Sequence, residues 1–256
     1  MPVSILYVLV VGSFALIDSL ASMEFLASKR QENKMRINWK AKFKRVLEHA
    51  ERGNTAAEAE VGLYYQYGVG TPKNARQAVK YFHRASAKQN PIGQYSLGYC
   101  FAEGVGVKKD LRAAYRWFMK AAQQGDVDAA WCVGHALRHG YGVRRNRKAG
   151  FAWMRKAARK KHTLAEFSVG VCYSFGEGVK QDSSKAFKYY LAAAKKGDAP
   201  AQYNVGYYYE HGCGRASNLR RACFWYRRAA AQGDKSAQLN LRLCRSALRR
   251  PNVGSA

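Results

Sequence analysis

Glycine recurs at a fixed spacing of 36 residues along most of this 256-residue chain. Each recurring glycine is followed, six residues later, by a G-x-G tripeptide. The five recurring glycines are Gly62, Gly98, Gly134, Gly170 and Gly206. A fixed period of this length is typical of helical repeats that stack in a line, so that each repeat contacts only its neighbours. The spacing therefore predicts one elongated solenoid domain instead of a single globular core.

The residues around each glycine predict a helix, a loop and a second helix. First helices should begin at residues whose side chains accept hydrogen bonds from the first turn. These capping residues are Asn54, Asn90, Asp126 and Asp198. In the fourth repeat His162 holds this place, and Thr163 is available as a substitute. The corresponding residues before the second helices are Asn74, Asp110, Asn146, Asp182 and Asn218.

Glycine has two expected steric roles in this unit. Inside the first helix it lets the second helix approach closely, at a cost of about 1 kcal/mol in helix propensity. At the end of the second helix, glycine can adopt the left-handed backbone conformation that terminates the helix. Gly125 and Gly197 hold this terminal position, whereas Gln89 and Lys161 depart from the pattern.

These residues resemble the Sel-like repeat family, whose α/α repeats are related to the tetratricopeptide repeats. The match is fullest from Gly93 to Ala122, and Leu137, Gly150 and Met154 are the main departures in the third copy. The resemblance implies an all-α, right-handed α/α solenoid, a superhelix of five helix-loop-helix repeats with capping helices at both ends. It also implies an interaction scaffold without chemistry of its own.

The predicted organisation follows from this register. The flanking segments match single helices of the unit, and Arg242 replaces the recurring glycine in the last one, which indicates that the array ends there. The expected segments are 1–38 (apolar N-terminal segment and basic linker), 39–53 (capping helix), 54–89, 90–125, 126–161, 162–197 and 198–233 (repeats), 234–250 (capping helix) and 251–256 (tail).

The chain is strongly basic, with 44 Lys and Arg residues against 17 Asp and Glu residues and a formal net charge of +27. The five first helices contain one basic residue, Arg138, whereas the loops and second helices between them contain 29. The basic residues therefore mark one surface, here called the basic ridge: Arg76, Lys80, Arg84, Arg112, Arg116, Lys120, Arg144, Arg145, Lys148 and Lys156. This surface either serves solubility alone or binds an anionic partner, such as an acidic protein, nucleic acid or membrane headgroups.

The resemblance to tetratricopeptide repeats implies that the first helices line a concave groove. The candidate partner-binding residues of this groove are Tyr67, Tyr99, Glu103, His135, Arg138, His139, Phe175, Tyr207, Glu210 and His211. The strip is aromatic and carries little charge, which suits a bound peptide or helix. The alternative is that several of these rings pack between adjacent repeats.

Six cysteines raise the question of disulfides. Some members of the resembled family link the two helices of a repeat with one cysteine in each, but no repeat here carries such a pair. The sequence therefore favours reduced thiols that act as small buried residues. The one pair expected to be able to meet is Cys213 with Cys223.

Enzymatic motifs are weak. His135 and His139 form an H-x-x-x-H pattern that can hold a metal, but the glutamate of H-E-x-x-H is missing and no further ligand is specified. The sequence has no P-loop, dinucleotide-binding motif or nucleophile elbow. We therefore expect no catalytic residue, metal or cofactor.

The N-terminal residues leave localisation open. Residues 3–17 form an apolar run that is short for a membrane span and suitable for the core of a signal sequence. Basic residues follow this run instead of preceding it, which argues against cleavage and export. Translation from Met23 or Met35 would remove the run. We favour a cytoplasmic protein, and the alternatives are a membrane anchor or export through residues 3–21.

The function predicted from these observations is that a monomeric scaffold binds another protein, one of acidic character. The alternative is RNA binding, because basic α/α repeats of this length can also read single strands. Such repeats need positive charge near the groove, and here the groove carries one arginine while the other charges lie elsewhere.

Overall fold

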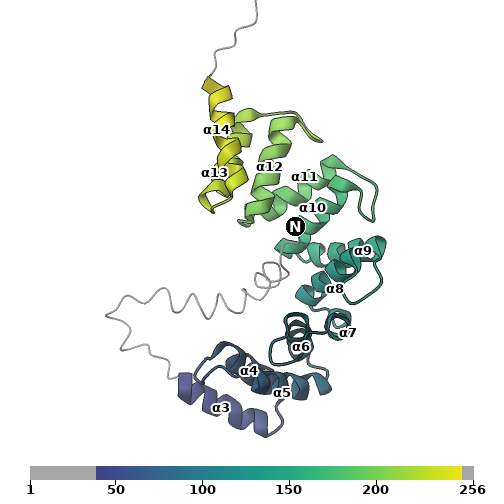
Figure 1. Cartoon of the computed structure of the whole chain (residues 1–256), viewed down its shortest axis with the longest axis vertical. Helices are drawn as coiled ribbons and strands as arrows, with labels where there is room; N and C mark the ends of the chain where they lie inside the picture. Colours follow the sequence, from purple (N-terminus) through teal and green to yellow (C-terminus); the bar gives the residue numbers. More distant parts are fainter. Residues whose placement is uncertain (1–38, 250–256) are drawn as a thin grey trace, which may run out of the picture. The chain divides into compact units, whose positions relative to one another are not determined.

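The computed structural model describes residues 39–249 (Figure 1), and these residues form α-helices without a β-strand. The predicted all-α solenoid of helical repeats is confirmed. The apolar N-terminal segment, the basic linker and the tail lie outside the described residues. None of the helices between residues 39 and 249 is both long enough and apolar enough to cross a membrane.

Helices of the two predicted registers alternate along the chain. The first-register helices are α4 (Thr55–Tyr67), α6 (Pro91–Glu103), α8 (Val127–His139), α10 (Thr163–Phe175), α12 (Ala199–His211) and α14 (Lys235–Arg249). The second-register helices are α3 (Trp39–Glu51), α5 (Ala75–Ala87), α7 (Leu111–Gln123), α9 (Arg147–Arg159), α11 (Ser183–Lys195) and α13 (Leu219–Ala231). Helices α3 and α14 are the ones that flank the repeats.

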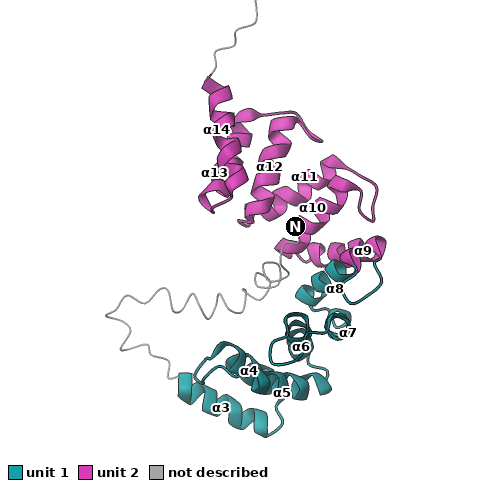
Figure 2. Ribbon diagram, in the orientation of Figure 1, with its two compact units in different colours: residues 1–136, 140–145 teal, residues 137–139, 146–256 magenta. Residues whose placement is uncertain are grey.

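The chain divides into two compact units within the third repeat (Figure 2). Of the described residues, the first unit comprises 39–136 and 140–145, and the second comprises 137–139 and 146–249. In the first unit each helix from α3 to α7 packs on the next one in the chain, and in the second unit the same holds from α9 to α14.

Side-chain caps begin the helices as the sequence predicts. Asn54 accepts a hydrogen bond from the amide of Ala57 at 2.9 Å, which satisfies one of the free N–H groups of α4. In the fourth repeat the ring of His162 itself is the cap, because its Nδ1 accepts from the amide of Ala165 at 3.1 Å. The expected substitution by Thr163 is therefore wrong, and Thr163 is the first residue of α10.

The recurring glycine allows the close approach that was predicted for it. A Cβ atom added to Gly98 would lie 2.5 Å from the ring of Phe118 on α7, and one added to Gly206 would lie 2.7 Å from the ring of Tyr226 on α13. Both distances are too short for carbon atoms that are not bonded. The aromatic side chain of the second helix therefore occupies the space that a larger residue would need.

A polar pair with one buried member links the start of the first helix to the end of the second helix in four repeats. Two of these pairs are ionic and two are formed by glutamine side chains. The pairs are Glu58 with Lys88 at 3.0 Å, Gln94 with Gln124 at 2.8 Å, Glu166 with Lys196 at 2.7 Å, and Gln202 with Gln232 at 2.9 Å. In the third repeat Ala130 replaces the first member, so this pair cannot form there.

The disulfide of the described region differs from the one weighed from the sequence. Cys223 on α13 is bonded to Cys244 on α14, with their Cα atoms 5.9 Å apart. The expected pairing of Cys213 with Cys223 is wrong, because Cys213 is free. The expectation that all thiols are reduced is also wrong, because Cys223 and Cys244 form this disulfide. Cys100, Cys132 and Cys172 are free and buried, as predicted for small core residues.

Candidate partner-binding surfaces

The first-register helices of the first unit present partly buried rings. Tyr67 at the end of α4 is 37% exposed, whereas Tyr99 on α6 is half-buried. Burial raises the pKa of Tyr99, and the nearby carboxylate of Glu103 adds to this effect. One oxygen of Glu103 is itself buried without a hydrogen-bond partner. Among these residues, Tyr67 is therefore the most accessible groove candidate.

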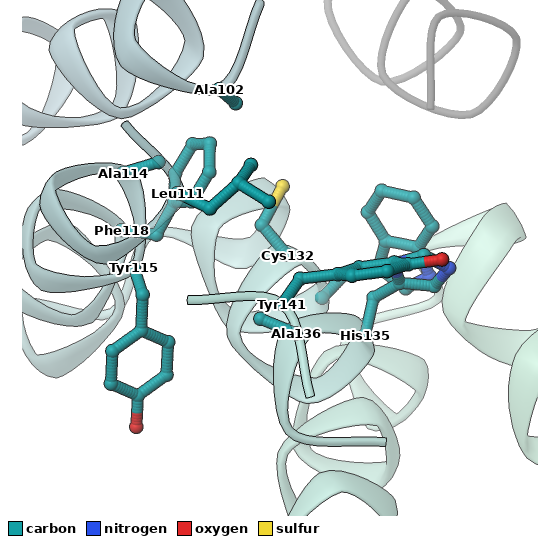
Figure 3. Close-up of a pocket in the computed structure, with 10 residues that line it drawn as sticks. Ala102, Leu111, Ala114, Tyr115, Phe118, Cys132, His135, Ala136 and Tyr141 are labelled. Atoms are coloured by element: carbon teal, nitrogen blue, oxygen red, sulfur yellow. The ribbon is translucent and has the colours of Figure 1, made fainter. Parts of the chain in front are cut away.

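His135 lies at an apolar cavity of the first unit (Figure 3). Its ring centroid is 5.4 Å from that of Trp131 and 5.6 Å from that of Tyr141. Leu111 and Tyr115 of α7 also line the cavity. The volume is about 40 Å³, well below the 300–1,000 Å³ typical of small-molecule sites. The cavity has room for part of one apolar side chain and not for a cofactor.

Aromatic and aliphatic side chains are more exposed on the first-register helices of the second unit. Phe175 on α10 is 72% exposed, Tyr207 on α12 is 40% exposed, and Leu243 on α14 is 59% exposed. The ring of Tyr207 stacks on that of His211 with centroids 4.1 Å apart. We call Phe175, Tyr207, His211 and Leu243 the apolar strip.

Hydrogen bonds between neighbouring first-register helices hold this strip together. The hydroxyl of Tyr208 on α12 donates to Ser174 Oγ on α10 at 2.8 Å. The side-chain amide of Asn240 on α14 donates to the hydroxyl of Tyr203 on α12 at 3.5 Å. The three helices therefore lie side by side, and their exposed side chains form one surface of the second unit.

The charged groove candidates of the second unit are paired within the protein. Arg138 Nε donates to Glu177 at 2.5 Å. Burial acts to raise the pKa of Glu177, but the hydrogen bond and charge of Arg138 lower it. Burial also lowers the pKa of His139, as does the neighbouring guanidinium. Glu210 accepts a hydrogen bond from the hydroxyl of Tyr226 at 2.6 Å. Arg138 and Glu210 thus offer little unpaired charge to a ligand.

Most residues of the basic ridge are exposed cations. In the first unit Arg112, Arg116 and Lys120 are exposed on α7 and form no ion pair with a carboxylate among residues 39–249. The same holds for Arg76, Lys80, Arg144 and Arg145 in the first unit and for Lys148 and Lys156 in the second. These side chains can attract an anion through a field that salt screens over about 8 Å.

Arg84 does not belong to this open surface. Its guanidinium pairs with Glu51 at 2.9 Å and with Glu58 at 3.0 Å, and it also donates to the carbonyl oxygen of Ala50 at 2.9 Å. The prediction that Arg84 is a ridge cation is therefore wrong. Arg84 is paired because Glu51 of α3 and Glu58 of α4 lie beside its position on α5.

Several ridge cations lie over aromatic rings of their own helix. Lys120 Nζ is 4.4 Å from the ring centroid of Trp117 in the first unit, and Lys156 Nζ is 4.9 Å from that of Trp153 in the second. The spacing of three residues places cation and ring on one helix face. These cations cover the rings that could otherwise have stacked on nucleic-acid bases.

Sequence reasoning missed two accessible features of the second unit. Leu243 lies 36 residues after Tyr207 and continues the apolar strip onto the flanking helix, a position that the repeat register could have identified. Arg215 stands where the other repeats have Thr71, Val107, Val143 and Val179. Comparing the same position across the repeats would have found this arginine.

No group of three or more His, Cys, Asp or Glu side chains that could hold a metal ion occurs within residues 39–249. The described surface consists of stacked helix pairs with exposed side chains, and it includes a small apolar cavity. This arrangement is that of a helical-repeat protein.

The comparisons with known proteins define this class further. The Sel1 repeat matches residues 55–90, 91–126, 127–162, 163–198 and 199–234, and the chain belongs to the Sel1 repeat family. Proteins of this family are generally scaffolds for protein–protein interaction and are typically not catalysts. No curated protein sequence matches the chain.

Solved structures show the same fold. A protective antigen of uropathogenic Escherichia coli with an SLR fold is 31% identical, with a TM-score of 0.75 over 83% of this chain and 46% of the antigen. The chain thus spans less than half the length of that antigen. A Sel1 repeat protein from Oxalobacter formigenes is 26% identical, with a TM-score of 0.74 over 85% of this chain and 94% of that protein.

Proposed function

We propose that this protein is a non-enzymatic scaffold that binds a peptide or helix of a partner protein along its first-register helices. The observation that carries the proposal is the apolar strip of the second unit. Exposed apolar side chains are common singly, but contiguous exposed patches on a soluble protein mark interaction sites. Aromatic residues such as Phe175 and Tyr207 supply large contact areas at a small cost in side-chain entropy.

The basic ridge has a separate role in this proposal. Its exposed cations would attract an acidic partner and accelerate association, while contacts on the apolar strip would slow dissociation. The cavity beside His135, in the first unit, would receive part of one apolar side chain of the partner. A monomeric chain would suffice for this mode of binding.

The experiment is affinity capture with the full chain as bait, at two salt concentrations, with and without nuclease. Wild type is compared with Phe175→Ser/Tyr207→Ser/Leu243→Ser and with the control Phe224→Ser, which removes an exposed ring from α13. We expect a set of proteins that is resistant to nuclease, lost in the triple variant and kept in the control. Equal capture by all three proteins would refute recognition by the apolar strip.

RNA or another nucleic acid remains the alternative ligand because of the exposed cations of the ridge. Binding through phosphates alone would weaken steeply with the logarithm of salt concentration. Capture that disappears after nuclease treatment, and that the triple variant retains, would favour this alternative. An anionic membrane would instead be detected by sedimentation with vesicles that contain phosphatidylserine.

A further inference from the structure

Two arginines of the fifth repeat lie against one aromatic ring in the second unit. The guanidinium carbon of Arg215 is 3.9 Å from the ring centroid of Tyr209 and 4.1 Å from that of Phe187. The guanidinium carbon of Arg221 is 5.6 Å from the same Tyr209 centroid, and its Nη1 is 3.3 Å from the Tyr209 hydroxyl oxygen. Tyr209 therefore contacts both cations.

Neither cation is neutralised by the protein. Within residues 39–249 no carboxylate lies in ion-pair distance of Arg215 or Arg221, and the Nε of Arg215 is buried without a hydrogen-bond partner. Aromatic faces attract a guanidinium but cannot accept its hydrogen bonds as an oxyanion can. The N–H groups of the two guanidinium groups, other than the buried Nε of Arg215, are thus the donors that remain for an external anion.

The preceding repeat provides an internal comparison. There Phe151 and Tyr173 form the same edge-to-face ring pair, with centroids 5.3 Å apart, as Phe187 and Tyr209 do at 5.3 Å. Lys185 lies 5.6 Å from the Tyr173 ring centroid, in the register of Arg221. However, Lys185 is paired with Asp182 at 3.0 Å.

Through three differences between these repeats, one paired cation at the Tyr173 ring is replaced by two cations at the Tyr209 ring that form no ion pair within residues 39–249. The three differences are Val179 to Arg215, Asp182 to Asn218, and Lys185 to Arg221, each 36 residues apart. The ring pair is kept, the acid is lost, and two guanidinium groups replace an aliphatic side chain and an ammonium group. The ring pair does not require this change, because the preceding repeat keeps the same ring geometry with a valine at this register position.

The geometry points to an oxyanion-binding site at Arg215 and Arg221 that takes a carboxylate or phosphate group carried on a peptide. This inference rests on the proposed binding of a protein partner, and it adds an acidic or phosphorylated residue to what that partner must present. Each planar guanidinium can donate two parallel hydrogen bonds to such a group. The loop that carries Arg215 is fixed by Ser184 Oγ, which donates to the carbonyl oxygen of Gly214 at 2.9 Å.

The test follows the arginine Nε–H resonances of the purified full chain by nitrogen-15 NMR at constant ionic strength. The probes are acetylated hexaglutamate, a phosphoserine hexapeptide of the same length, and inorganic phosphate, with chloride as the reference anion. We expect a saturable shift of the Arg215 resonance with at least one peptide. Arg215→Val should weaken that binding at least tenfold, measured on the Arg221 resonance.

Arg215→Val installs the side chain of Val107, Val143 and Val179 at this position, so the variant is expected to fold. The matched control is Arg220→Ala, which removes an exposed cation next to Arg221 and should leave binding unchanged. Preference for hexaglutamate would assign the site to an acidic residue, and preference for the phosphopeptide to a phosphorylated one.

Three results would overturn the site as proposed. They are equal shifts with chloride, equal losses in Arg215→Val and Arg220→Ala, and tighter binding of inorganic phosphate than of either peptide. The measurement uses purified components and defined probes, so its failure leaves the capture experiment on the apolar strip unaffected. Conversely, a failed capture experiment would leave the NMR result standing as an anion site without a known partner.

Discussion

Replacing Lys196 should show how much the polar pair of Glu166 and Lys196 contributes to the stability of the fourth repeat. The carboxylate of Glu166 is 7% exposed, and Lys196 Nζ lies 2.7 Å from it. Lys196 Nζ also donates to the carbonyl oxygen of Lys161 at 2.5 Å. Lys196→Met keeps the apolar stem but leaves the buried carboxylate without its cation.

The expected loss is about 2–3 kcal/mol. Removing one partner of a fully buried ion pair costs about 3–5 kcal/mol, because the other charge stays buried and unpaired. Lys196 is 34% exposed, so water can approach Glu166 after the substitution and the loss should be smaller than this. Lys195→Met, which removes a neighbouring exposed lysine, should change stability by no more than about 0.5 kcal/mol.

The glutamine pair of the fifth repeat suggests a double variant that should restore the stability lost in Lys196→Met. Glu166→Gln/Lys196→Gln recreates the pair formed by Gln202 and Gln232, which is 2.9 Å long and has a further bond to the carbonyl oxygen of Gly197. This double variant should therefore lie within about 1 kcal/mol of wild type, since replacing both partners removes the buried charge. The assay is urea unfolding with amide hydrogen exchange in α10 and α11. A double variant as unstable as Lys196→Met would refute the reasoning.

Three further predictions concern the chain's local stability. Cys223→Ser/Cys244→Ser opens a disulfide with a sequence separation of 21, which should lower the stability of α14 by about 3 kcal/mol in hydrogen exchange; unchanged exchange would argue against the disulfide. Gly125→Ala should destabilise the protein by about 1 kcal/mol in thermal melts through backbone strain alone, because φ is +95° and the added Cβ meets no atom within 4 Å. Gln89→Gly should stabilise the protein by a similar amount, because glutamine there has a φ of 59°. Burial raises the pKa of Asp198, so the folded protein binds the carboxyl proton more tightly than the unfolded chain does. The free energy of unfolding should therefore fall as the pH rises from about 4 through the folded-state pKa. Asp198→Asn should raise the urea midpoint at pH 7 but not at pH 3.

The helical architecture could be predicted because its determinants recur at one spacing. Gly98 must face a ring, and Asn54 and Asp110 have side chains that satisfy a first turn, so each residue type has a local cause. His162 shows the limit of this reasoning. Its capping role depends on which ring nitrogen faces the amide of Ala165, and residue preference alone favours the neighbouring threonine.

The side-chain partners were harder to predict because they come from different repeats or elements. Arg84 has the same sequence spacing as the exposed Lys120, but α3 and α4 bring Glu51 and Glu58 to it. Cys244 shares the register of the free Cys100, and its bond to Cys223 depends on how α14 packs on α13. The repeat register predicts which residues could contact a partner, but their accessibility depends on how neighbouring helices pack.

The polar pairs also restrict how the array can grow by gene duplication. The two members of a pair are 30 residues apart, so only a short stretch of each repeat lies outside the segment they enclose. A duplicated segment that begins between Lys88 and Gln94 copies matched partners together. A crossover elsewhere between a Glu–Lys repeat and a Gln–Gln repeat would place glutamine opposite lysine, or glutamate opposite glutamine, and change the partner of a buried side chain. Between repeats of these two kinds, recombination junctions that keep the pairs are therefore confined to the boundary between a second helix and the next first helix.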